Sequence, residues 1–159
     1  MDRVAIALGS NVGDRRAHLD YGVSALRGLL TNLAVSRYYE TVPLGVSGPH
    51  AMFLNAAAVG DTALTARAVL DALLAIEQER GRERPYARAP RTLDLDLILL
   101  GDVVLEEPGL VVPHPRFRER RFVLEPLAAV APELRDPVSG KTVGELLSAV
   151  AAAEGQDVA

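Results

Sequence analysis

The sequence of 159 residues contains no cysteine and no tryptophan, and four tyrosines and three phenylalanines are its only aromatic residues. Without cysteine the chain can form no disulfide bond, no cysteine-based zinc site and no thiol nucleophile. So few aromatic side chains argue against the broad stacking surface of an RNA-binding sheet. No run of 18 apolar residues occurs, so we expect no membrane-spanning helix. What is left is an ordinary globular composition, with 49% hydrophobic and 24% charged residues.

The length predicts one domain over residues 1–159, with a disordered tail from about residue 152. The first residues, MDRVAIALGSN, include too short an apolar stretch for a signal peptide. We therefore expect a cytoplasmic protein, and we expect it to act as a monomer.

Lysine is nearly absent as well, because Lys141 is the only one beside 16 arginines. The net charge of −4 argues against general nucleic-acid binding. Nine of the arginines nevertheless fall within two short segments, 80–91 and 116–121. Since the guanidinium group suits forked contacts with phosphate, these clusters favour a compact anionic ligand. The alternative is that single arginines are solvated surface residues at helix ends.

Hydrophobic periodicity predicts strands over 3–8, 33–40, 52–60 and 93–100, and helices over 15–30 and 66–80. Loops are expected at 41–50, which is rich in Pro and Gly, and at the arginine-rich 82–92. A hairpin at 103–105 and 110–112 and helices near 122–131 and 143–153 would follow. The chain thus predicts an α+β fold with a ferredoxin-like β-α-β-β-α-β core. We expect a mainly antiparallel sheet with its helices packed on one face, and additional C-terminal helices.

The sharpest local feature is the run LDLDL at 93–97. Strand alternation places Asp94 and Asp96 on one face, with Cα atoms roughly 6.5–7 Å apart. The leucines at 93, 95, 97 and 99 are expected to face the core. Two carboxylates at this spacing can bind Mg²⁺ together with water and substrate phosphates. The alternative is a strand whose other face is simply wet, but Ile98 and Leu100 make the continuation of that face apolar.

Arginines precede this aspartate pair, at 82, 84 and 91. Divalent metal and guanidinium groups together are the equipment of phosphoryl transfer, where positioning and charge neutralisation dominate catalysis. Neither a P-loop nor a G-x-G-x-x-G motif is present, so side chains and metal must hold any nucleotide. His114 lies between two prolines, which restrict its backbone and present the imidazole rigidly. The alternative is a structural or exposed histidine.

A third set combines two phenylalanines with an amide. Phe53 and Asn55 are two residues apart on one predicted strand and so share a face. Together with Phe122 they could hold a flat heterocycle, whose edge an amide can pair with. The alternative is that both phenylalanines belong to the core. Glu77, on the second predicted helix, is expected on the polar surface.

Seven short motifs occur together and in order along the chain. They are GSN at 9–11, Y-x-T-x-P-x-G at 39–45, FLNA at 53–56, GR at 81–82, APRTLDLD at 89–96, VPHP at 112–115 and R-x-FVL at 120–124. In this combination the chain resembles the 6-hydroxymethyl-7,8-dihydropterin pyrophosphokinases of folate biosynthesis, over about residues 4–150. The PRTLDLD run is the most specific piece.

The resemblance implies an ATP- and Mg²⁺-dependent enzyme that transfers pyrophosphate from ATP to 6-hydroxymethyl-7,8-dihydropterin and releases AMP. It implies that Asp94 and Asp96 bind two Mg²⁺, and that Arg82 and Arg91 act in catalysis with them. The residues implied at the ATP site are Glu77, Arg82, Arg84, Arg91, Ile98, His114 and Arg120. Those implied at the pterin site are Thr41, Val42, Leu44, Phe53, Asn55 and Phe122. In this arrangement the pterin ring lies between the two phenylalanines and Asn55 reads its amide edge.

Two other functions remain compatible with the sequence. A non-catalytic ferredoxin-like sensor would bind a nucleotide or an amino acid and would not need the aspartate pair. A different Mg²⁺-dependent phosphotransferase or nucleotidyltransferase would use the pair but form another product.

Overall fold

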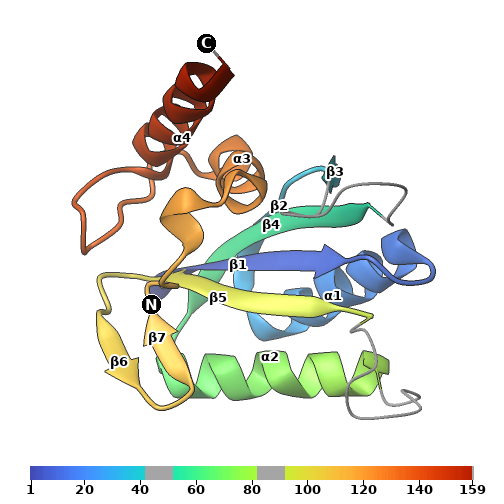
Figure 1. Cartoon of the computed structure of the whole chain (residues 1–159). Helices are drawn as coiled ribbons and strands as arrows, with labels where there is room; N and C mark the ends of the chain where they lie inside the picture. Colours follow the sequence, from blue (N-terminus) through green and yellow to red (C-terminus); the bar gives the residue numbers. More distant parts are fainter. Residues whose placement is uncertain (42–51, 82–91, 159) are drawn as a thin grey trace.

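The computed structural model describes residues 1–41, 52–81 and 92–158 of the chain (Figure 1). The two predicted loops lie mostly outside these ranges. A five-stranded sheet forms the centre of the molecule, and a two-stranded hairpin and further helices follow it. The elements in chain order are β1 (Asp2–Ser10), α1 (Arg15–Leu29), β2 (Thr31–Val35), β3 (Tyr39–Thr41), β4 (Phe53–Thr62), α2 (Ala66–Gly81), β5 (Asp94–Leu100), β6 (Leu105–Glu107), β7 (Leu110–Val112), the 3₁₀ helix η1 (Phe117–Glu119), α3 (Arg121–Val130) and α4 (Val143–Val158).

The central sheet has the strand order β2-β4-β1-β5, and each of these neighbouring pairs is antiparallel. Helices α1 and α2 follow β1 and β4 in the chain, as the β-α-β-β-α-β pattern requires. The predicted α+β class and ferredoxin-like core are confirmed. Short β3 pairs with the first residues of β4, with Tyr39 opposite Asn55 and Thr41 opposite Phe53. It therefore lies along the same edge of β4 as β2 does, but further along it.

The strand predicted over 33–40 is in fact the two short strands β2 and β3. Ser36 interrupts it, because its hydroxyl oxygen accepts the N–H of Ala57 at 3.0 Å. Its own N–H donates to the carbonyl of Ala57 at 2.9 Å. A side chain thus replaces a main-chain acceptor in the ladder at this point. Serine hydroxyls commonly compete with main-chain groups for such hydrogen bonds.

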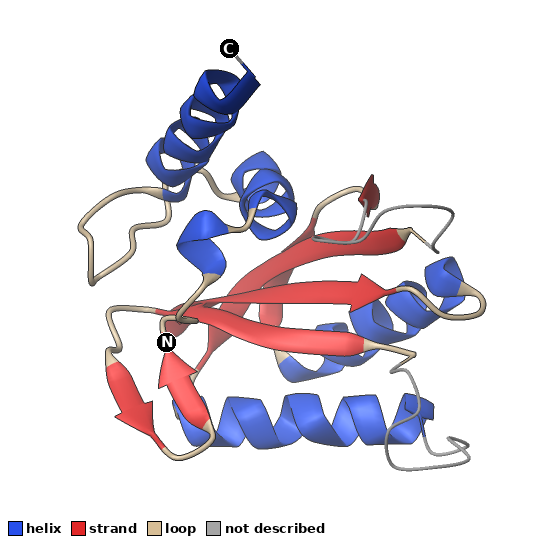
Figure 2. Cartoon of the chain, viewed as in Figure 1, coloured by secondary structure: helices blue, strands red, loops and turns tan. Residues whose placement is uncertain are grey.

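Helices cover both faces of the sheet, so the prediction of helices on one face is wrong (Figure 2). The strands themselves are the reason, because they carry apolar residues on both sides. In β1, Val4, Ile6 and Leu8 pack into the core under α1 and α2. Ala5 belongs to a second core, where Ala57 and Val59 of β4 join it. Helix α3 closes the second core with Val123, Leu124 and Leu127, and Val143 and Leu146 of α4 belong to it as well.

A bulge in β5 also changes one predicted orientation. Its register against β1 shifts between Ala5, which pairs with Leu99, and Ile6, which pairs with Leu97. Ile98 is therefore the extra residue. Leu97 lies in the first core while Leu99 lies in the second. Simple alternation, which contains no extra residue, predicts that Leu99 shares the face of Leu97; the bulge makes this prediction wrong.

The ends of the elements follow local rules. Asp14 caps α1 by accepting the N–H of Ala17 at 3.1 Å. Helix α4 continues to Val158, through the segment from 152 that we expected to be disordered. Alanine and glutamate at 151–154 favour that continuation. Within the described residues, no helix is long and apolar enough to cross a membrane.

Candidate active site

The face of the sheet toward α3 holds a cavity of about 380 Å³. Strand register accounts for its contents, because Gly9 of β1 pairs with Asp94 on one side and with Asn55 on the other. Ala7 pairs with Asp96 in the same way. Four strands thus present one continuous face, and helix α3 lies above it. The cavity is lined by Ala7, Leu8, Gly9, Thr41, Phe53, Asn55, Asp94, Asp96, Arg120, Phe122 and Val123.

Small residues of β1 form the floor of this cavity. A Cβ atom on Gly9 would lie 3.1 Å from Oδ1 of Asn55, which is closer than ordinary packing allows. Glycine at this position therefore lets the Asn55 amide lie directly beside the strand. Ala7 is the next residue on the same face. Sequence reasoning did not identify Ala7, Leu8, Gly9 or Val123 as lining residues; the pairing register of β1 is what would have identified Ala7 and Gly9.

The phenylalanines divide between core and cavity. Phe117 has an exposed fraction of 0% and is the large side chain of the second core. Phe53 and Phe122 are only partly buried, and both line the cavity, from β4 and α3. Two aromatic side chains thus line the same cavity, one from the sheet and one from the helix above it. Phe122 also packs against the second core, whereas Phe53 is a member of neither core cluster.

Asn55 fixes the polar side of the same region. Its side chain is almost fully buried, and its Nδ2 donates to Oγ1 of Thr41 at 2.5 Å. Thr41 belongs to β3, so this hydrogen bond ties the cavity face of β3 to that of β4. It also restricts the rotation of the amide, which can then present a defined edge to a ligand.

Asp94 and Asp96 both line the cavity, as strand alternation predicted. Asp94 is half-buried and Asp96 is exposed. His114 lies near Asp96, and its main-chain N–H donates to the carbonyl of Ile98 at 3.0 Å. Burial lowers the pKa of His114; the charge of Asp96 opposes this, whereas Arg120 and Arg116 reinforce it. The imidazole is therefore neutral at pH 7, and its Nδ1 accepts the N–H of Arg116 at 3.2 Å.

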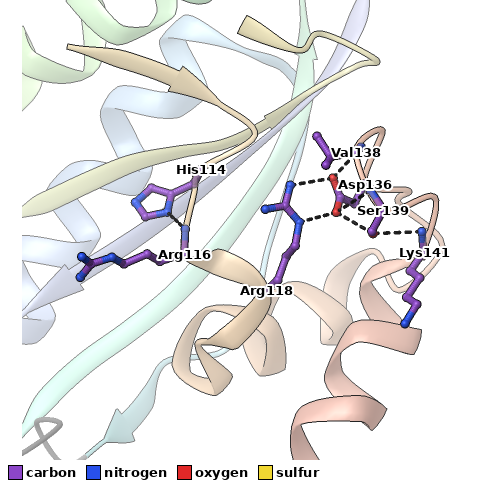
Figure 3. A network of polar contacts seen from close by, with 7 residues as sticks. All are labelled: His114, Arg116, Arg118, Asp136, Val138, Ser139 and Lys141. Atoms are coloured by element: carbon purple, nitrogen blue, oxygen red, sulfur yellow. Dashed lines mark hydrogen bonds and ion pairs between the residues drawn. The ribbon is translucent and has the colours of Figure 1, made fainter. Parts of the chain in front are cut away.

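The arginine cluster at 116–121 divides between two roles. Arg120 lines the cavity, and its guanidinium carbon lies 5.6 Å from the centre of the Phe122 ring. Arg121 pairs instead with Glu125 and Glu154, at 3.0 and 2.6 Å. Arg118 turns away from Arg116 and toward the loop before α4 (Figure 3). The prediction of a compact anionic site in this segment thus rests on Arg116 and Arg120 alone.

Arg118 forms a two-pronged ion pair with Asp136, whose carboxylate is completely buried. The distances are 2.5 Å from Nε to Oδ2 and 3.1 Å from Nη2 to Oδ1. The hydroxyl of Ser139 and the N–H groups of Val138 and Ser139 also donate to this carboxylate (Figure 3). The pair therefore holds η1, which lies between Arg116 and Arg120, against the loop that leads into α4.

Three described residues that the resemblance implied at ATP do not line this cavity, namely Glu77, Ile98 and His114. Glu77 of α2 accepts the main-chain N–H of Leu95, in β5, through Oε2 at 2.7 Å. Ile98 is 2% exposed within the second core. Five further residues lie outside the described part of the chain, namely Val42, Leu44, Arg82, Arg84 and Arg91.

Comparison with known proteins agrees with this arrangement. Residues 5–132 match the family of 7,8-dihydro-6-hydroxymethylpterin-pyrophosphokinase (HPPK). The chain belongs to this family. It is therefore a pyrophosphokinase of folate biosynthesis, and the resemblance seen in its motifs is confirmed.

Curated relatives of similar length are named for the same pyrophosphokinase activity. The chain is 44% identical over 151 residues to the 2-amino-4-hydroxy-6-hydroxymethyldihydropteridine pyrophosphokinase of Pseudomonas aeruginosa, covering 94% of this chain and 92% of that one. For the Bacillus subtilis protein of that name, identity is 41% over 146 residues, covering 89% and 87%. The crystal structure of Plasmodium falciparum HPPK-DHPS has the same fold, with a TM-score of 0.73 at 15% identity. It covers 92% of this chain, which spans 44% of that longer one.

The buried ion pair leads to a prediction about stability. Burial opposes ionisation of Asp136, but Arg118, Ser139 and Val138 outweigh it and lower the pKa from 3.8 to about 2. Replacing Asp136 by Asn should cost about 3 kcal/mol, because it leaves the charge of Arg118 without its partner. A carboxyl whose pKa falls on folding stabilises the fold above its ordinary pKa and stops doing so as the pH drops through the folded value.

The difference in unfolding free energy between wild type and Asp136→Asn should therefore be largest above pH 4 and narrow between about pH 4 and pH 2. Urea unfolding across this range measures it. As a control, Asp71→Asn removes the same charge from an exposed position of α2, and it should leave the unfolding free energy unchanged. A difference that does not change with pH would contradict the role given to the Asp136 carboxylate.

Proposed function

We propose that the chain uses ATP and Mg²⁺ to form the diphosphate of 6-hydroxymethyl-7,8-dihydropterin. The hydroxymethyl oxygen would bond to the β-phosphorus of ATP while the bond from that phosphorus to the α,β-bridging oxygen breaks, so that AMP leaves and the hydroxyl loses its proton. One observation carries the proposal. A single cavity combines two phenylalanines and an amide, suited to a flat heterocycle, with two carboxylates suited to a metal-bound triphosphate.

The proposed pterin end consists of Phe53, Phe122, Asn55 and Thr41. Aromatic side chains on β4 and α3 can enclose a ring from its two faces, which holds it by stacking and by exclusion of water. The Asn55 amide offers both a donor and an acceptor to the pyrimidinone edge of the pterin. Val42 and Leu44, from the same family motif, are proposed at this end too.

The proposed metal ligands are Asp94 and Asp96. Both line the cavity from one face of β5. Their carboxylate oxygens suit Mg²⁺, which prefers one or two carboxylates together with water and phosphate oxygens. The described residues include no group of three or more side chains able to hold a metal, so phosphate and water would complete the coordination. Bound Mg²⁺, of which we propose two ions, would neutralise phosphate charge and favour loss of the hydroxyl proton.

The proposed phosphate end includes Arg120 and His114. Arg120 lines the cavity beside the aspartates, where its guanidinium can offset the charge that the reaction redistributes among phosphate oxygens. A neutral His114 can donate a hydrogen bond through Nε2, since Nδ1 already accepts one. Arg82 and Arg91 are proposed as further catalytic residues, with Arg84, Glu77 and Ile98 at the nucleotide. Glu77 and Ile98 would act here through the shape of β5.

We further propose that the enzyme is a cytoplasmic monomer that acts on small molecules and binds neither membranes nor nucleic acid.

The reaction is tested by product analysis. With ATP, Mg²⁺ and the reduced pterin alcohol, we expect AMP and pterin diphosphate in equal amounts, and no AMP when either the pterin or Mg²⁺ is omitted. Formation of ADP would indicate a different phosphotransferase, and release of inorganic pyrophosphate a nucleotidyltransferase. Ligand binding without turnover would favour a sensor and would overturn the proposal.

Asparagine substitutions test the metal ligands. Asp94→Asn and Asp96→Asn each remove one negative charge at the cavity, and losing several kcal/mol of charge stabilisation should lower kcat roughly 100-fold or more. Higher Mg²⁺ concentration should restore part of the activity. Both variants should unfold at the temperature of the wild type, as should the control Asp71→Asn, which should retain full activity. Activity within tenfold of the wild type in both aspartate variants would exclude the metal role.

A further inference from the structure

One guanidinium group joins the ends of two strands beside the cavity. Arg15, the first residue of α1, donates through Nη1 to the carbonyl oxygen of Met52 at 2.8 Å. Through Nη2 it also donates to Oε1 of Glu40 at 2.6 Å. Glu40 is the middle residue of β3, and Met52 comes directly before β4. The two contacts therefore fix the spacing between the last residues of β3 and the first of β4.

Both of these partners are sequence neighbours of cavity residues. Glu40 precedes Thr41 and Met52 precedes Phe53, and Thr41 pairs with Phe53 in the sheet. Glu40 pairs with Leu54, which belongs to the first core under α1, so its side chain faces α1. Thr41 and Phe53 face the opposite side, toward α3. Arg15 thus holds the frame of the cavity from behind, without lining the cavity itself.

The local sequence gives no reason for arginine at this position. Helix α1 has no acidic residue in its first turn, where the positive end of the helix dipole favours one. A cation there is unfavourable unless a tertiary contact compensates for it. Glu40 and the Met52 carbonyl are such contacts, and residues that break a local rule in this way often serve a functional site.

Strand β3 also has few other contacts to hold it in place on the α1 side of the sheet. Strand β3 has three residues, and its described partner in the sheet is β4 alone. Its displacement would move Thr41 and release the Asn55 amide, which donates to Thr41 at 2.5 Å. The ion pair is partly exposed, with side chains 29% and 55% accessible, so it contributes little to global stability. Its effect should therefore fall on geometry rather than on folding.

We infer that Arg15 is a positioning residue for the pterin end of the cavity, and that it acts through Glu40 and Met52 on Thr41, Phe53 and Asn55. This inference rests on the proposed assignment of that end to the pterin. The nucleotide end, built on β5 and on the segment before α3, lies across the sheet from Arg15 and should not respond.

The test compares Arg15→Gln with Arg16→Gln. Both remove one positive charge from the start of α1, but Arg16 stacks on the ring of Tyr38 at 5.2 Å, whereas it is Arg15 that donates to Glu40 and to the Met52 carbonyl. For Arg15→Gln we expect the KM for the pterin to rise about tenfold, with kcat and the KM for ATP within twofold of the wild type. The Kd of the pterin, measured by calorimetry with α,β-methylene-ATP bound, should rise by the same factor. Arg16→Gln should leave all four values within twofold.

Two further variants make the outcome decisive. Glu40→Gln removes the ion pair and leaves the Met52 contact, so it should raise the pterin KM by less than Arg15→Gln does. Phe53→Ala removes a proposed pterin contact directly. An unchanged pterin Kd in Phe53→Ala would overturn the assignment of that end of the cavity. A weakened Kd in Phe53→Ala with an unchanged one in Arg15→Gln would overturn only the role of Arg15.

A merely structural role would give another pattern. Arg15→Gln would then lower the unfolding temperature and raise the KM for ATP and for the pterin together, which would overturn the inference. If Arg15→Gln does not fold, Glu40→Gln gives the same comparison at the other end of the ion pair. A selective rise in the pterin KM there supports positioning, and equal changes in both KM values refute it.

Discussion

Antiparallel pairing of β1 with both β4 and β5 is the constraint on which the whole site depends. It places Gly9 between Asp94 and Asn55, and Ala7 beside Asp96, all on the side of the sheet that α3 covers. A slip of one residue would turn these side chains to the opposite face, because strand alternation has a period of two. The leucines and isoleucine on the α1 side resist such a slip, since it would expose them to water. Core packing on one face thus holds the functional groups on the other.

The face of the sheet toward α3 carries both the second core and the cavity. Ala5, Ala57 and Val59 pack under α3 and α4, whereas Ala7 and Gly9, further along β1, leave space under Phe122. The pair between Arg118 and Asp136 ties η1 to the loop before α4, so the roof of the cavity is held by contacts outside it. Arg15 does the same for β3 from the α1 side. The hollow exists because its floor is made of small residues and its walls are supported from behind.

The arginines of segment 116–121 are divided between the cavity and the structure around it. Arg118 and Arg121 are neutralised by carboxylates away from the cavity, and Arg120 is left to face it. Asp96 and Arg120 act on His114 in opposite directions, and burial decides the outcome in favour of the neutral imidazole. A segment of four closely spaced arginines therefore supplies both structural ion pairs and a positive charge at the cavity. Counting the charges along the chain does not separate the two uses.

Periodicity was enough to predict the β-α-β-β-α-β order of the core, because a chain must bury its apolar residues at the spacing of one element or the other. It did not separate β2 from β3. It also placed Asp94 and Asp96 on one face, and the motifs were enough to identify the family. Contacts between residues distant in sequence decided the rest. Apolar residues on both sides of β1 brought helices to both faces, and the bulge at Ile98 turned Leu99 into the second core. Which arginines face the cavity depended on where Asp136 and Glu154 lie, and the role of Arg15 depended on Glu40, 25 residues away. Local sequence records the preference of each segment, but the partner of a charged side chain is set only when the segments pack together.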